Sequence, residues 1–210
     1  MEKSTFILGV SGASCSGKTW LTNQIKNIRP QEVTIFELDN YYKSIEYVSS
    51  LKYRHDNPDS IDFEKAIEDF KLLQQGQEIT LPSYDFATHK VTGERIVIPT
   101  QFIIVEGIFA FSNPWLTQQM DLKIWVDTDE EKCLTRRIDR DTKERGRTSS
   151  QIIDRYRRDV SPAFKTYIYP HRKEADIYIE NNNENKKIGV ITDLIWAYVD
   201  RKINNSNFIN

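Results

Sequence analysis

Residues 12–19 constrain the fold of this chain more than any other segment. They read Gly-Ala-Ser-Cys-Ser-Gly-Lys-Thr, a full match to the phosphate-binding loop pattern G-x-x-x-x-G-K-[ST]. The glycines allow backbone N–H groups to turn inward around a polyphosphate. The lysine of this pattern reaches the β- and γ-phosphates, and the final hydroxyl ligates Mg²⁺. The motif therefore predicts a nucleoside triphosphate site in a strand–loop–helix unit.

The sequence on either side of the loop fits this unit. Residues 5–10 are mostly apolar, as in a buried strand, and apolar residues recur at helical spacing at Trp20, Leu21, Ile25 and Ile28. A helix that starts at the loop directs the positive end of its dipole at the bound anion. An ordinary Gly/Ser-rich turn needs no such flanks, so they favour the phosphate-binding interpretation.

Composition limits the classes of protein that remain. The 210 residues are 39% hydrophobic and 29% charged, with a formal net charge of −2. This balance predicts one soluble domain over residues 1–210 and disfavours a general nucleic-acid partner. No apolar stretch reaches the roughly 20 residues that span a bilayer, and no signal-peptide pattern precedes the first strand. Cys15 and Cys133 lack zinc or C-x-x-C spacing, so we expect a cytoplasmic protein with free thiols and no membrane partner.

Strand-like runs alternate with segments of helical periodicity along the chain. This alternation predicts a mostly parallel sheet covered on both faces, a three-layer α/β/α domain of the P-loop NTPase type. Residues 79–98 are predicted to form a small β-hairpin outside the main sheet. The capping-box pattern at residues 128–131 predicts the start of a helix. The other predicted strands are residues 31–38, 102–106, 122–126 and 175–179, and the predicted helices are 20–28, 63–73, 128–138, a helix from 151 and 188–203.

Chemistry-bearing residues follow the predicted strands at their carboxyl ends. The phosphate-binding loop follows the first strand, Asp39 follows the second, and Glu106 ends the run at residues 102–106. Ligands of parallel α/β sheets bind at this edge, so we expect these residues to converge on one site. A kinase needs such a set: a base for the acceptor hydroxyl, an acid for Mg²⁺, and arginines that neutralise the transferring phosphoryl group.

A strongly basic segment provides candidate arginines. Residues 132–158 contain ten Lys and Arg against four Asp and Glu, a local excess of six positive charges. Either a solvated helical face or a bound polyanion explains such a run. Other nucleotide-binding classes fit less well, because the chain has no Asn-Lys-x-Asp motif to read guanine and no room for the partner domains of a helicase or transporter ATPase. A small kinase remains the best interpretation.

Taken together, the motifs resemble those of the uridine kinase (uridine–cytidine kinase) family of P-loop kinases. The resemblance runs from about residue 6 to about residue 180. Its Asp-x-Tyr-Tyr, Tyr-Asp-Phe-x-x-His and Arg-Gly-Arg elements are far more specific in combination than the P-loop is. The matching segments are residues 12–19, 39–43 (DNYYK), 55–62 (HDNPDSID), 82–86 (PSYDF) with His89, 105–108 (VEGI), 126–128 (VDT), Arg136-Arg137, Arg140-Asp141, 144–147 (ERGR) and 175–176 (AD).

The resemblance implies a kinase that uses ATP, or GTP, to phosphorylate the 5′-hydroxyl of uridine or cytidine, giving UMP or CMP in pyrimidine salvage. Mg²⁺ is the implied cofactor. The implied partners are a small nucleoside and a nucleoside triphosphate, and homo-oligomers, often tetramers, are common in the family. The hairpin at residues 79–98 would lie over the nucleoside, and residues 139–150 would form an arginine-rich helical lid.

The resemblance also implies a role for each matching residue. Asp39 would be the general base, Asp56 would bind the ribose, and His89 would bond the polar edge of a stacked base. The implied catalytic residues are Asp39, Lys18, Arg140, Arg145 and Arg147. The implied nucleotide-binding residues are Gly12, Ala13, Ser14, Cys15, Ser16, Gly17, Lys18, Thr19, Arg145 and Arg147, and the implied Mg²⁺ ligands are Thr19, Asp39 and Glu106. The implied nucleoside-binding residues are Asp39, Tyr42, Asp56, Tyr84, Phe86, His89, Arg137, Arg140 and Arg155.

Three residues depart from the family pattern, all on the implied nucleoside side. Family members usually have Phe where this chain has His55, His where it has Asn57, and Gln where it has Arg155. Because these changes add cationic groups near the acceptor, an alternative function stays possible: a related P-loop kinase that acts on nicotinamide riboside, pantothenate or a sugar phosphate. A non-catalytic nucleotide-binding regulator is the alternative from another class, and the presence of Asp39, Glu106 and the lid arginines disfavours it.

Overall fold

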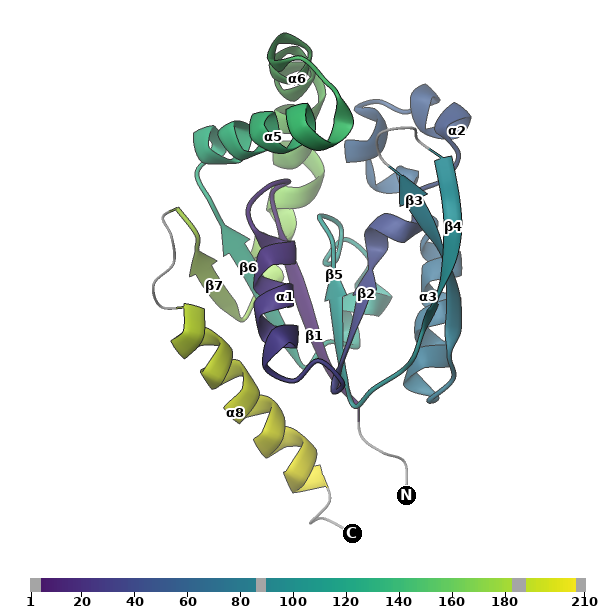
Figure 1. Cartoon of the computed structure of the whole chain (residues 1–210), viewed down its shortest axis with the longest axis vertical. Coiled ribbons are helices and arrows are strands. Elements are labelled where there is room, and N and C mark those ends of the chain that lie inside the picture. Colours follow the sequence, from purple (N-terminus) through teal and green to yellow (C-terminus); the bar gives the residue numbers. More distant parts are fainter. Residues whose placement is uncertain (1–4, 86–89, 183–187, 207–210) are drawn as a thin grey trace.

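A five-stranded parallel sheet forms the centre of the molecule in the computed structural model, which describes residues 5–85, 90–182 and 188–206 (Figure 1). Its strands are β1 (Phe6–Gly12), β2 (Val33–Glu37), β5 (Phe102–Glu106), β6 (Leu122–Asp127) and β7 (Ile177–Glu180). Their order across the sheet is β2-β5-β1-β6-β7, and every pairing is parallel. All residues of β1 and β5 are buried, as expected for central strands covered on both faces.

Alternate strand residues enter two apolar layers, one on each face of the sheet. In β1, Ile7 packs into one layer and Leu8 into the other, because successive side chains of a strand point to opposite faces. The predicted three-layer α/β/α fold is therefore confirmed. The layer of Leu8 is covered by α1 (Lys18–Ile28) and α8 (Ile188–Ser206), and the layer of Ile7 by α3 (Phe63–Gln74) and α4 (Pro114–Gln118).

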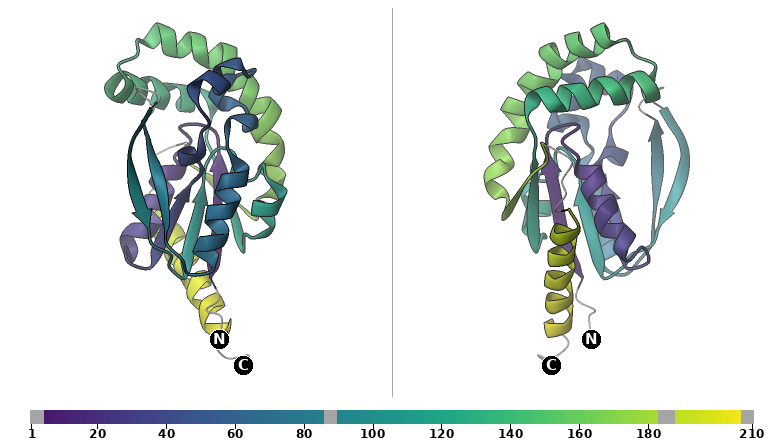
Figure 2. Two further views of the ribbon diagram at one scale, coloured as in Figure 1. Left: turned by 90° about the vertical axis from the view of Figure 1, so that its right-hand side faces the viewer. Right: turned by 60° about the vertical axis from the view of Figure 1, so that its left-hand side comes forward.

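A helical layer crosses the carboxyl ends of the strands. Helix α5 (Glu130–Arg145) and helix α6 (Ser149–Arg155) lie above the sheet in all three views (Figures 1 and 2). From α6 the chain stays helical as far as Glu174. The elements of this run are η4 (Tyr156–Val160), α7 (Ser161–Ala163), η5 (Phe164–Ile168) and η6 (Tyr169–Glu174). Of these, η4 and η5 are π-helical and η6 is a 3₁₀ helix.

None of the helices in the described ranges is both long and apolar enough to cross a membrane.

The capping box predicted at residues 128–131 is wrong. Asp129 is the N-cap of α5 and makes no side-chain capping bond, while the Thr128 hydroxyl donates to the backbone oxygen of Ser16 at 2.9 Å. The competing tertiary bond to the phosphate-binding loop takes the hydroxyl that the local pattern assigned to the helix. A capping box forms instead between Thr148 and Gln151, where it opens α6.

The predicted hairpin lies outside the main sheet. Strand β3 (Ile79–Asp85) pairs antiparallel with β4 (Lys90–Val97) (Figure 2). The Thr34 hydroxyl of β2 donates to the backbone oxygen of Ile98 at 2.7 Å. This bond anchors the end of the hairpin beside the edge of the sheet. Four short elements connect β2 to α3: η1 (Leu38–Tyr41), α2 (Ile45–Ser50), η2 (Arg54–Asp56) and η3 (Pro58–Ser60).

Candidate active site

The loop between β1 and α1 has the backbone geometry of a phosphate cradle. Gly12 and Gly17 have φ values of +150° and +102°, and Cys15 has +64°, in the left-handed region that builds anion-binding concavities. A Cβ atom at Gly12 would lie 2.5 Å from the backbone oxygen of Val126, so this position requires glycine. Cys15 has a Cβ atom and adopts the left-handed conformation at a cost in strain, which is typical of functional loops.

Three side chains of the predicted nucleotide site meet beneath this loop. Lys18 Nζ donates to the backbone oxygen of Ala13 at 2.9 Å, and Thr19 Oγ1 donates to Glu106 Oε1 at 2.8 Å. Burial raises the pKa of Glu106, while the charge of Lys18 and the bond from Thr19 oppose that shift. A cavity of about 300 Å³ opens here, lined by these residues and by Asp39 and Arg140, among others. The predicted convergence of strand ends is confirmed.

Asp39 stands at the junction of two cavities. It lies in η1, directly after β2, and it lines both the cavity above Lys18 and a second cavity of about 60 Å³. Asp39 is exposed as a residue, yet desolvation of its carboxyl group within the cleft raises its pKa, while the charge of Lys18 opposes the shift. Arg140 also lines both cavities, so an anionic base and a cation meet where the two spaces join.

The second cavity gathers the predicted acceptor-side residues. Tyr42 lies in its wall and donates its hydroxyl to the backbone oxygen of His55 at 3.1 Å. Burial raises the pKa of Asp56, and the charges of Arg137 and Arg155 oppose that rise. The lining residues are Ser14, Asp39, Tyr42, His55, Asp56, Ile108, Arg137, Arg140, Arg145, Arg147 and Arg155.

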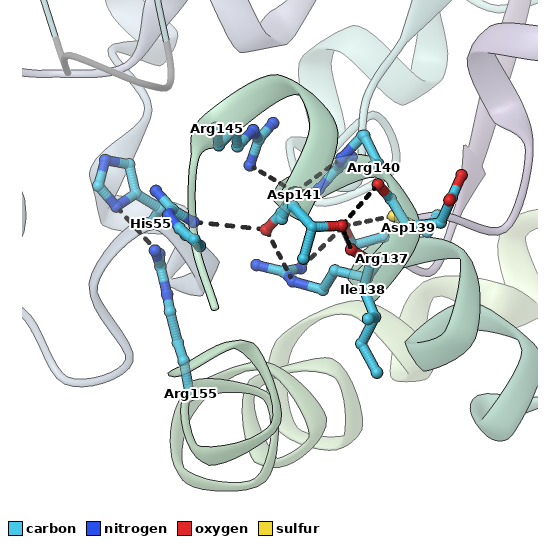
Figure 3. A network of polar contacts seen from close by, with 12 residues as sticks. His55, Arg137, Ile138, Asp139, Arg140, Asp141, Arg145 and Arg155 are labelled. Carbon is cyan, nitrogen blue, oxygen red and sulfur yellow. Dashed lines mark hydrogen bonds and ion pairs between the residues drawn. The ribbon is translucent and has the colours of Figure 1, made fainter. Parts of the chain in front are cut away.

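Two of the three departures from the family pattern lie in this cavity, and the third does not. His55 Nδ1 and Arg155 Nη2 are 3.5 Å apart, and burial lowers the pKa of Arg155 (Figure 3). Asn57 instead caps the turn η3, because its Oδ1 accepts the N–H of Asp59 at 2.9 Å and its Nδ2 donates to the Lys52 oxygen at 3.0 Å. The residue at 57 therefore supports the loop, whereas His55 and Arg155 face the acceptor space.

The predicted lid arginines converge on a single carboxylate. Asp141, on α5, is fully buried and forms ion pairs with Arg137, Arg140 and Arg145 (Figure 3). It also pairs with Arg147. Burial, followed by the charge of Arg140, lowers the pKa of Arg145 to about 10. The lid predicted at residues 139–150 thus spans the end of α5, a turn at Gly146 with φ +62°, and the start of α6.

Some of the predicted base-binding residues lie beyond what the structure describes. Phe86 and His89 are outside the described residues, as is the side chain of Tyr84 in β3. The expected stacking of a base on these aromatic faces, and the contact of His89 with its polar edge, stay predictions.

Two residues that support the phosphate-binding loop were not predicted. Asn181 Nδ2 donates to the backbone oxygen of Ser16 at 2.7 Å, and Arg136 Nη1 donates to the same oxygen at 3.3 Å. Arg136 also bonds the backbone oxygen of Asn181 at 2.8 Å and lines the larger cavity. From the sequence alone, Arg136 could equally be a solvent-exposed residue on a helix or a residue of the nucleotide site. The signal for Asn181 was its position at the carboxyl end of β7, the edge that ligands use.

The cradle, the Thr–Glu pair beneath it and the arginine-rich layer above it define a P-loop kinase. Residues 7–187 match the model of the Phosphoribulokinase / Uridine kinase family, and the chain therefore belongs to this family of ATP-dependent kinases. A uridine kinase of Staphylococcus epidermidis is 40% identical over 204 residues, which cover 94% of this chain and 99% of that protein. A uridine kinase of Staphylococcus aureus is 40% identical over 208 residues, covering 95% and 100%.

The fold is shared with solved structures of lower sequence identity. Phosphoribulokinase from Rhodobacter spheroides superposes with a TM-score of 0.61 at 17% identity, covering 86% of this chain and 71% of that chain. At this identity the likeness shows the fold alone. The sequence relatives, in contrast, match this chain over nearly its whole length.

Proposed function

We propose that this kinase transfers the γ-phosphoryl group of ATP to the 5′-hydroxyl of uridine or cytidine, producing UMP or CMP for pyrimidine salvage. The observation that carries the proposal is the position of Asp39 between the two cavities. A nucleotide in the larger cavity and a small acceptor in the smaller one would meet at this carboxylate. The family of the chain and the names of its relatives at 40% identity support a pyrimidine nucleoside as the acceptor.

The residues around the larger cavity fit Mg²⁺ and a nucleoside triphosphate. Thr19, Asp39 and Glu106 offer hydroxyl and carboxylate oxygens, which are the donors Mg²⁺ prefers. Within the described ranges, no group of three or more His, Cys, Asp or Glu side chains forms a metal site of its own. Mg²⁺ in kinases is commonly held by one or two carboxylates together with substrate phosphates, and Asp39 and Glu106 can supply those carboxylates. Bound there, Mg²⁺ would neutralise charge on the phosphates.

Phosphoryl transfer in this site rests mainly on position and charge. Lys18 would exchange the Ala13 oxygen for phosphate oxygens, and Asp39 would orient the acceptor hydroxyl and take its proton. The new bond forms between that hydroxyl oxygen and the γ-phosphorus, while the bond to the β-phosphate oxygen breaks and ADP leaves. Arg140, Arg145 and Arg147 would stabilise the charge on the transferring group, and the lid would exclude water.

The acceptor cavity supplies contacts for a ribose. Asp56 is a buried carboxylate that can accept hydrogen bonds from vicinal hydroxyls, and Arg137 and Arg155 balance its charge. Tyr42 closes the wall beside it. A 2′-deoxyribose would leave part of this acceptor capacity unused.

One observation favours a second candidate acceptor. His55 and Arg155 add polar donors to a cavity that Arg137, Arg140, Arg145 and Arg147 already line. Such a cavity suits an acceptor that carries an anionic group, such as a sugar phosphate. Arginine matches phosphate geometry better than any other side chain.

The proposal is tested by ATP consumption without and with uridine or cytidine, with the product identified by mass spectrometry. We expect ADP release to depend on the nucleoside and to match UMP or CMP formation mole for mole. ADP release that no nucleoside stimulates would refute the acceptor. An absence of both turnover and nucleoside binding would favour the non-catalytic regulator.

A further inference from the structure

Asp141 holds more arginines than its own charge requires. Its carboxylate lies 2.8 Å from Arg140 Nη2, 3.4 Å from Nη1 of both Arg145 and Arg147, and 3.7 Å from Arg137 Nε. One guanidinium would suffice to neutralise a buried carboxylate. We propose that Asp141 is a positioning residue, which assembles these four arginines at the reacting centre. The inference rests on the kinase class of the chain and not on which acceptor it uses.

The electrostatics of the cluster support this role. The arginines lower the pKa of Asp141 despite its burial, so the carboxylate stays ionised at neutral pH. Both carboxylate oxygens take part: Arg140 and Arg145 approach Oδ1, and Arg137 and Arg147 approach Oδ2. Without this anion, four like charges would face one another in a partly buried space. Asp141 therefore fixes where the positive charge lies as well as reducing its mutual repulsion.

The contacts of Arg140 with Asp141 leave N–H donors of Arg140 for a substrate. Each guanidinium has five N–H donors. Arg140 uses Nε and Nη2 on Asp141 Oδ1, and its side chain lines both cavities. Arg137 also donates from Nη1 to Ser14 Oγ of the phosphate-binding loop at 3.0 Å. Asp141 thereby connects that loop to the lid through Arg137.

The backbone of Asp141 fixes the same lid turn. Its carbonyl oxygen accepts the N–H of Gly146 and the N–H of Arg147, the latter at 3.2 Å. Side chain and main chain of one residue thus hold both the turn after α5 and the arginines on either side of it. Alignment of donors before the reaction is what transition-state stabilisation by fixed charges requires.

The test compares Asp141→Asn with Asp139→Asn on the same helix. Asp139 is exposed and pairs with Lys143 at 2.6 Å, so it controls for the chemical change. We expect Asp141→Asn to lower kcat by about 10- to 100-fold, as when aligned donors are lost. Its Kd for ATP, titrated without acceptor, should be unchanged or lower, because a competing anion is gone. Asp139→Asn should change kcat by no more than about twofold. Equal kcat in the two variants would overturn the proposal.

A second measurement covers a variant that is too unstable for kinetics. Inorganic tripolyphosphate should raise the melting temperature of Asp141→Asn more than that of wild type or Asp139→Asn, because a polyanion replaces the missing carboxylate. Equal shifts in all three proteins would overturn the proposal. If wild type proves inactive on uridine, the acceptor assignment fails, while the tripolyphosphate shifts still decide the role of Asp141.

Discussion

Replacement of Asp39 by Asn separates catalysis from folding at the centre of the site. Among the described residues, no hydrogen bond or ion pair joins the Asp39 side chain to the rest of the fold, whereas the carboxylate faces both cavities. The amide keeps the shape of the side chain but cannot take a proton. We expect kcat to fall by about 10²-fold or more, equivalent to about 2.7 kcal/mol of transition-state stabilisation.

The stability of the folded state should not fall with kcat in the Asp39→Asn variant, and should stay the same or rise. The cleft raises the pKa of Asp39, so the folded state binds the proton more tightly than the unfolded chain does. Stability therefore falls as the pH rises from the ordinary pKa through the raised one, and the ionised carboxylate destabilises the fold at neutral pH. Asp39→Asn should melt at the same temperature as wild type or higher.

The assay for this variant is steady-state kinetics at pH 7 with thermal melting of the same preparation. Asp59→Asn is the matched control, because Asp59 is exposed and lines neither cavity. The control should keep wild-type kcat. Near-normal turnover of Asp39→Asn, or a loss of activity that follows a loss of folded protein, would show that Asp39 is not the catalytic base.

Three other perturbations follow from the same geometry. Alkylation of Cys15, a free thiol that lines the larger cavity, should abolish kinase activity, and bound ATP–Mg²⁺ should protect the thiol from alkylation. Full activity after complete modification, verified by mass spectrometry, would contradict this prediction. Glu106→Gln removes the charge behind Thr19 and should raise the Mg²⁺ concentration for half-maximal rate about tenfold; an unchanged Mg²⁺ titration would argue against the metal role. Arg155→Gln should reduce any activity on phosphorylated acceptors about tenfold and activity on uridine by a smaller factor, with exposed Arg157→Gln as the control. Equal losses on both acceptors would count against the specificity role.

The sequence predicted the parts of the site that follow from local pattern. The phosphate-binding loop requires glycine at particular backbone angles, so the glycine positions within residues 12–19 predict its geometry. Asp39 and Glu106 were predictable because parallel strands bring their carboxyl ends to one edge. The arginine-rich segment was recognisable by charge, and the structure brings its members together over that edge.

Long-range bonds explain what the sequence did not reveal. The Thr128 hydroxyl, Arg136 and Asn181 all donate to one backbone oxygen of the loop, from residues more than 100 positions away in the chain. No local pattern records such a bond. The sequence presents Asp141 only as part of the Arg140-Asp141 motif, because its role depends on the fold of α5 and the following turn, which places four guanidinium groups around it.

The values of kcat/KM for a panel of acceptors, measured on one preparation, decide whether a pyrimidine nucleoside is the preferred acceptor. The panel is uridine, cytidine, deoxyuridine, adenosine and ribulose 5-phosphate. We predict that uridine or cytidine is used best, and that deoxyuridine is about ten- to a hundredfold worse because part of the Asp56 interaction is unmade. Adenosine should be rejected by the size of the pocket. A higher kcat/KM for ribulose 5-phosphate than for both pyrimidine nucleosides would contradict the proposed function.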